Sequence, residues 1–110
     1  MKRITYYIGL HSPTATNRAE DIIERRTNAL DVLASYYDAV TITETLGMWE
    51  GIEEPSLRAE VLIDEPNVLD GLPSRTEQAR EIARGIARTL DQDAVGLTVE
   101  PVTLELISGR

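Results

Sequence analysis

The sequence has 110 residues, of which 42% are hydrophobic and 27% charged, and it contains no cysteine. These values are typical of one globular domain over 1–110 and exclude a disulfide framework, a thiolate metal site and a cysteine nucleophile. No apolar run is long enough to span a membrane and the N-terminus does not resemble a signal peptide, so we expect a cytoplasmic protein without membrane contact.

The charge is strongly acidic and unevenly distributed. The net charge is −8, from 11 basic and 19 acidic residues, and residues 41–72 hold eight carboxylates beside the single Arg58. Binding to nucleic-acid phosphates requires clustered Lys and Arg, so nucleic acid is not expected as a direct partner. The acidic segment leaves open an inhibitor or nucleic-acid mimic encoded by a mobile element.

The first half of the chain predicts a strand, a helix and a second strand. Apolar residues alternate over 4–10, which is the period of a strand, and Ser12-Pro13 ends it. A helix is predicted over about 15–37, with Thr14, Thr16 and Asn17 as possible caps. Its apolar stripe consists of Ala19, Ile22, Ile23, Ala29, Leu30, Leu33 and Tyr37. The β-branched run 40–46 predicts the next strand.

The second half predicts the same alternation. A turn-prone stretch, 47–55, precedes a strand over 56–63 whose inward residues are Leu57, Ala59, Val61 and Ile63. A loop is expected at 67–73. Ser74 and Glu77 have the spacing of a capping box for a helix over 74–91. Residues 94–107 read as a last extended region, in which Pro101 favours an edge strand.

The order βαββαβ predicts an α+β, ferredoxin-like fold, a four-stranded antiparallel sheet with two helices on one face. The first and third strands should be central, and the second and fourth should form the edges. The uncovered face would carry Thr5, Tyr7, Arg58, Glu60, Leu62 and Ile107. Because exposed faces and edges are normally protected, we expect a homodimer that buries Tyr7, Leu62, Ile107 and part of Trp49.

This topology gathers residues that are distant in the sequence at one end of the sheet. They are His11, Ser12, Trp49, Glu50, Glu53, Glu54, Gln92 and Asp93. His11, the only histidine, is a weak candidate for a general base held by Glu53, Glu54 or Asp93, and the alternative is an ordinary loop histidine. Glu50, Glu53, Glu54 and Asp93 could bind a hard cation, but a solvated acidic loop is favoured, and neither a metal nor another cofactor is expected.

Trp49, the only tryptophan, lies beside Met48 between Gly47 and Gly51. This composition is typical of an interaction site, although a tryptophan that covers the core remains an equal alternative. A protein partner could therefore bind through the hairpin that contains it. On the second helix, the stripe Arg80, Arg84 and Arg88 is interpreted as a solvated face paired with Glu77 and Glu81.

The run from Gly47 to Leu57, followed by Gln92-Asp93-Ala94-Val95-Gly96-Leu97, resembles small uncharacterised phage and prophage proteins. These proteins carry a Gly-x-Trp-x-Gly-x-x-Glu hairpin, a helix, and Gln-x-Ala-Val before a final strand. The resemblance covers about half of the chain, implies an αβ sandwich and supplies no activity. It makes Trp49, Glu54 and Gln92 the matching positions.

Three hypotheses for function follow from the sequence. The first is a non-enzymatic, self-associating binding or regulatory module, with Trp49, Glu53, Glu54, Gln92 and Asp93 as binding residues. The second is a small cofactor-independent enzyme that uses His11 with a nearby carboxylate such as Glu54. The third is the acidic inhibitor or mimic. No nucleophile motif or phosphate-binding loop distinguishes among them.

Overall fold

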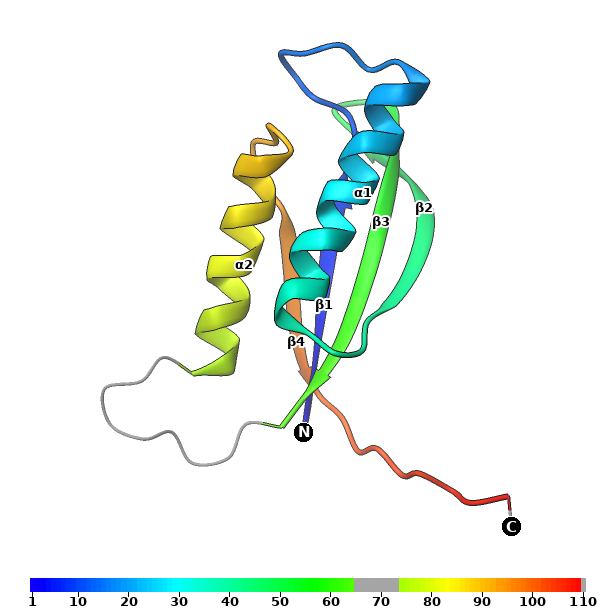
Figure 1. Ribbon diagram of the computed structural model, residues 1–110, viewed down its shortest axis with the longest axis vertical. Coiled ribbons are helices and arrows are strands. Elements are labelled where there is room, and N and C mark those ends of the chain that lie inside the picture. The colour runs from blue at the N-terminus through cyan, green and yellow to red at the C-terminus, as the bar shows by residue number, and fades with distance from the viewer. Residues whose placement is uncertain (65–73, 110) are drawn as a thin grey trace.

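The computed structural model describes residues 1–64 and 74–109, and of Trp49 only the backbone. The loop expected at 67–73 lies outside the described residues. The elements follow the order β1 (Lys2–Gly9), α1 (Ala19–Tyr36), β2 (Thr41–Trp49), β3 (Ile52–Ile63), α2 (Arg75–Thr89) and β4 (Gly96–Pro101). This order confirms the predicted βαββαβ arrangement, and both helices lie on one side of the sheet (Figure 1).

The four strands form one antiparallel sheet in the order β2-β3-β1-β4. The first and third strands are therefore central and β2 and β4 are the edges, as the sequence predicted. In the register, Thr5 of β1 is opposite both Glu60 of β3 and Thr98 of β4. Residues opposite one another point to the same face of an antiparallel sheet, so this register decides which side chains share each face.

The core lies between the helices and the sheet. It contains the predicted alternating residues of β1 and β3 and one face of α2, and the buried set is Ile4, Tyr6, Ile8, Leu10, Ala29, Leu33, Leu57, Ala59, Val61, Ile63, Ala79, Ile82, Ala83, Ile86 and Leu90. The stripe predicted on α1 is narrower than expected. Ala29 and Leu33 are buried, whereas Ile23 is mostly exposed because it lies beside the contact face rather than on it.

The stretch 47–55, which the sequence predicted as a turn, belongs mostly to two strands. Glu50 and Gly51 have φ angles of 50° and 77° and form the two-residue connection of the β2–β3 hairpin. Positive φ at both central positions gives a turn whose twist matches that of the flanking strands. The strands therefore continue to Trp49 and from Ile52, which are opposite each other.

The last strand is shorter than predicted, because β4 ends at Pro101. Residues 102–109 form a C-terminal tail that extends away from the sheet (Figure 1). Ile107 is therefore not on the uncovered sheet face, and this part of the prediction was wrong. Pro101 is opposite Lys2, and one further hydrogen bond, from the Val102 N–H to the Met1 carbonyl, lies beyond the ladder.

The uncovered face is more polar than a typical dimer interface. Arg3 lies between Glu60 and Glu100, at 4.0 and 3.4 Å, and Arg58 is 2.5 Å from Glu60. Thr5 is buried, and among the described residues of this face Tyr7, Ile52 and Leu62 add large, exposed apolar surface. No helix within the described residues is long and apolar enough to cross a bilayer.

Candidate functional site: the sheet end

A polar network centred on Ser12 holds the loop that follows β1. The Ser12 hydroxyl accepts hydrogen bonds from the backbone N–H groups of Thr14 and Ala15, at 3.2 and 2.9 Å. It donates to a carboxylate oxygen of Asp91 at 2.7 Å. Only 4% of Ser12 is exposed, whereas its three partners are exposed, so these bonds are partly buried. The network joins the loop to the end of α2.

Asn17 and Arg25 fix the rest of this loop. The Asn17 carbonyl oxygen accepts from the Ser12 N–H at 2.7 Å, and its amide donates back to the Ser12 carbonyl at 3.1 Å. The Arg25 guanidinium donates to the carbonyl oxygens of Leu10 and Thr16, at 2.9 and 2.6 Å, and to the Asn17 side chain. These bonds keep residues 11–17 out of helical geometry, which is why α1 begins at Ala19 and not near residue 15.

Asp91 is held in a conformation that non-glycine residues rarely adopt, with φ 53° just after α2. The hydroxyls of Thr14 and Ser12 both donate to the Asp91 carboxylate. Together with the charge of Arg25, these bonds hold the pKa of Asp91 below its ordinary value. The next residue, Gln92, donates its side-chain amide to the His11 carbonyl.

Glu54 of β3 reaches the same end from the other side. Its carboxylate accepts from the backbone N–H of His11 at 3.3 Å. It lies over Gly9, where an added Cβ would be only 2.6 Å from a Glu54 oxygen. A larger residue at Gly9 would therefore require the Glu54 carboxylate to move. The Leu10 N–H also bonds the Pro55 carbonyl, at 3.0 Å.

The structure brings together four of the residues predicted to meet at this end, namely His11, Ser12, Glu54 and Gln92. Glu50, Glu53 and Asp93 are exposed and form no hydrogen bond or ion pair with another described residue. Sequence reasoning missed Asn17, Arg25 and Asp91. A polar residue directly after a helix, as at Asp91, is a weak signal that could have indicated a capping contact.

His11 contacts the network through its backbone. Its N–H bonds Glu54 and its carbonyl accepts from Gln92, whereas no described residue hydrogen-bonds its imidazole. No group of three or more His, Asp or Glu side chains among the described residues could hold a metal ion. This arrangement suits positioning of the loop better than activation of the imidazole.

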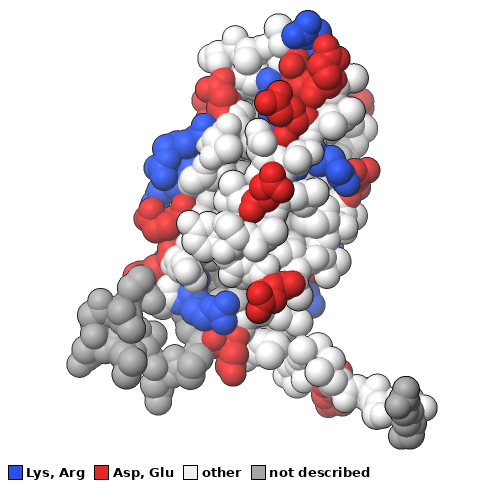
Figure 2. All heavy atoms as spheres, viewed as in Figure 1, with Lys and Arg blue, Asp and Glu red and all other residues white. Residues whose placement is uncertain are grey.

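Three carboxylates of the acidic segment 41–72 have partners among the described residues. Glu44 lies 2.6 Å from Arg26, Glu60 pairs with Arg58, and Glu54 contacts His11. Acidic and basic side chains are interspersed over the face that Figure 2 shows. Glu50, Glu53 and Asp64 of this segment are exposed, and an inhibitor or nucleic-acid mimic stays a prediction.

The β2–β3 hairpin tip carries exposed apolar surface. Leu46, Met48 and Ile52 are 67%, 68% and 66% exposed. Leu46 is opposite Pro55 and Met48 is opposite Glu53, so Leu46 and Met48 lie on one face of the hairpin. Large apolar side chains gathered on an ordered element are typical of interaction sites.

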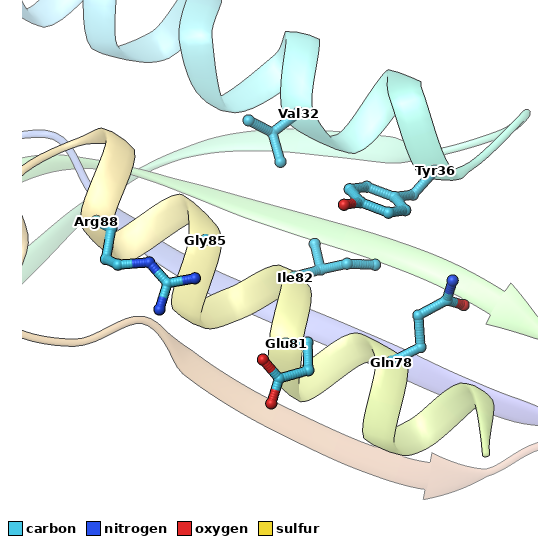
Figure 3. Close-up of a pocket in the computed structure, with 7 residues that line it drawn as sticks. All are labelled: Val32, Tyr36, Gln78, Glu81, Ile82, Gly85 and Arg88. Carbon is cyan, nitrogen blue, oxygen red and sulfur yellow. The ribbon is translucent and has the colours of Figure 1, made fainter. Parts of the chain in front are cut away.

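A separate hollow of about 310 Å³ lies between the two helices. Val32 and Tyr36 extend into it from α1 and Ile82 from α2, with Gln78, Glu81 and Arg88 around it (Figure 3). It is open to solvent, and it contains none of the site residues that the sequence predicted.

Comparison with known proteins supports the fold. No protein-family model and no curated protein matches the sequence. A phage SAM lyase solved with S-methyl-5′-thioadenosine is similar in structure, with a TM-score of 0.59 and 14% identity, over 90% of this chain and 79% of that one. The phage SAM lyase in its apo state has a TM-score of 0.58 and 13% identity, over 90% of this chain and 78% of that one.

A DUF3240 family protein from Shewanella baltica OS155 is similar as well, with a TM-score of 0.53 and 9% identity over 97% of both chains. At these identities the likeness concerns the fold. It assigns no specific role to this chain.

Proposed function

We propose that this protein is a small self-associating binding module whose interaction surface is the β2–β3 hairpin tip. The observation that carries this proposal is the exposure of Leu46, Met48 and Ile52 on a strand pair that is ordered up to its two-residue turn. Methionine adapts to varied partners, and exposed apolar residues on a rigid element bind with little loss of conformational entropy.

The polar network supports this function by anchoring the hairpin. Glu54 joins β3 to the loop at His11, and Gln92 joins that loop to the end of α2. The tip is thus presented from a fixed base. Trp49, Glu53, Glu54, Gln92 and Asp93 remain the proposed binding residues, with Leu46, Met48 and Ile52 added.

Light scattering at micromolar concentration tests this proposal. We expect at least twice the chain mass of 12.2 kDa, and we expect the variant Leu46→Glu/Met48→Glu to return to one chain mass. Ile23→Glu changes an equally exposed apolar residue on α1 and should leave the mass unchanged. A wild-type protein of 12.2 kDa at every concentration would overturn the proposal.

The same experiment distinguishes the hairpin from the uncovered sheet face. Leu62→Glu alters that face, which the sequence suggested as the dimer interface. If Leu62→Glu abolishes association and Leu46→Glu/Met48→Glu does not, the interface is the sheet face and the hairpin proposal is wrong.

A second candidate function is a cofactor-independent enzyme that binds a thioadenosine-type ligand at the sheet end. The observation that favours it is Glu54, a partly buried carboxylate beside His11, in a fold shared with a lyase solved with S-methyl-5′-thioadenosine. A carboxylate in this position could stabilise a cationic sulfonium substrate.

Calorimetric titration with S-methyl-5′-thioadenosine and with SAM tests this candidate. We expect binding that Glu54→Gln weakens and that Glu81→Gln, a change on the exposed face of α2, leaves unchanged. Absence of heat at millimolar ligand would remove the candidate and leave the binding module alone.

A further inference from the structure

The C-terminal tail, residues 102–109, is an extended segment without a strand partner among the described residues. Val102 donates its N–H to the Met1 carbonyl at 3.0 Å, and residues 103–107 make no backbone hydrogen bond to another described residue. Leu106 and Ile107 are 90% and 85% exposed, and Leu104 is 46% exposed. Such apolar residues on an unpaired, extended backbone are a template for pairing with another strand.

The side chains of the tail alternate as in a strand that has one apolar face. If it remains extended, Val102, Leu104 and Leu106 share one side, and Thr103, Glu105 and Ile107 share the other. Glu105 is the only charged residue in 102–109. Because the chain has a net charge of −8, a segment with a single charge is one of those that a second copy repels least.

The outer edge of β2 has matching properties. It is an edge of the sheet, so one side of its backbone has no strand beside it among the described residues. Leu46 and Met48 share a face with Ile42, and the threonines of β2 occupy the other. Its only charged residue, Glu44, is neutralised by Arg26 at 2.6 Å.

Leu104 and Leu106 cannot lie beside Leu46 and Met48 of their own chain. The tail leaves from β4, and β2 is at the opposite edge, three strand spacings or about 14 Å away. Leu106 is five residues beyond Pro101, which is about 17 Å of fully extended chain, so crossing the sheet would consume most of this reach. A second copy has no such limit.

We propose that the tail of one copy adds as a further strand along β2 of a second copy, with Leu104 and Leu106 beside Leu46 and Met48. The inference rests on the proposed self-association and names its partner surface. Main-chain hydrogen bonds would provide affinity, and the alternating side chains would set the register. The exposed apolar residues of both segments would be covered in one interface.

A charge exchange in the full chain tests the pairing by light scattering. Leu104→Lys/Leu106→Lys and Leu46→Glu/Met48→Glu should each reduce the mass from at least two chains to one. An equimolar mixture of the two variants should associate again, because lysines of one chain then lie beside glutamates of the other. Leu62→Lys, a change on the uncovered face, should leave the wild-type mass unchanged.

The outcomes separate this inference from the proposed function. If the lysine variant keeps the wild-type mass, the tail is not the partner segment, although self-association stands. If the wild-type protein has the mass of one chain, both fail.

Cross-linking gives an independent readout, because the natural chain has no cysteine. A tagged Leu106→Cys chain mixed with a Met48→Cys chain should form a mixed disulfide dimer on oxidation. Leu106→Cys mixed with Glu77→Cys, an exposed position on α2, should not. Efficient dimers of Leu106→Cys alone would show pairing between tails and would overturn the assignment to β2.

Discussion

The helix-covered side of the sheet and the sheet end around Ser12 are stabilised in different ways. The first is an apolar core, in which one hydrogen bond, 2.6 Å between the hydroxyls of Tyr6 and Tyr37, accompanies many buried aliphatic side chains. The second is a network of directional bonds that joins a loop, the end of α2 and the start of β3. Burial is non-directional and tolerates small changes, whereas each bond of the network depends on one donor and one acceptor.

The largest expected effect is a loss of stability in the core. Leu33→Ala removes a side chain that is 1% exposed and leaves a cavity between α1 and the sheet, which should lower the free energy of unfolding by about 2–5 kcal/mol. Urea denaturation measures this change. Ile23→Ala, on the exposed side of the same helix, should change it by less than about 0.5 kcal/mol. Equal losses for both variants would contradict the observed core.

The next effect concerns the network. Ser12→Ala removes one donor and one acceptor at a buried position and should cost about 1–3 kcal/mol. Hydrogen exchange should show faster opening at Thr14 and Ala15 than in the wild type, with the core of β1 unchanged. Uniformly faster exchange over the whole chain would mean that this end is not a separate unit.

The contrast also explains how far the sequence could predict the molecule. The strands, helices and most of the core follow from periodicity, which is visible in neighbouring residues such as Ile4, Tyr6 and Ile8. The topology further predicted that His11, Glu54 and Gln92 meet. Periodicity and topology could not identify Arg25 and Asp91. Their roles depend on the direction of the Arg25 guanidinium and on the positive φ of Asp91, which neither pattern shows.

The errors have similar causes. The hairpin was predicted too short because Gly47 and Pro55 suggest turns, yet both fit into paired strands here. The final strand was predicted too long because the tail retains alternating β-branched and apolar residues after Pro101. The amino-acid composition of a segment does not show whether a partner strand is available to it.

A smaller effect is expected from the tyrosine pair. Burial, and after it the bond with Tyr37, raises the pKa of Tyr6 well above its ordinary value. The resulting stabilisation is fully present below the ordinary pKa of about 10 and is lost as the pH rises above it. Tyr37→Phe should cost about 1 kcal/mol at neutral pH. The difference in stability between the two proteins should narrow as the pH rises above about 10, and a gap of constant size at alkaline pH would contradict this account.

The smallest expected effect is that of Asp91→Asn, and it depends on pH. The hydroxyl bonds lower the pKa of Asp91 in the folded protein, so its contribution is present above the ordinary pKa of about 4 and is lost as the pH falls through the folded value. Thermal unfolding should show the wild type more stable than the variant near neutrality. The two curves should converge below about pH 4, and a gap that persists there would mean that the carboxylate charge is unimportant.

The central position of β1 has a consequence for how the chain acquires its fold. β1 pairs only with β3 and β4, although it precedes both in the chain, and its second ladder ends at Pro101. The β2–β3 hairpin, in contrast, can close from neighbouring residues. During synthesis the apolar side chains of Ile4, Tyr6 and Ile8 stay uncovered until β3 and β4 have been made. Non-local pairing of this kind slows folding. The ribosome-bound nascent chain is therefore the stage at which this protein is most exposed to aggregation.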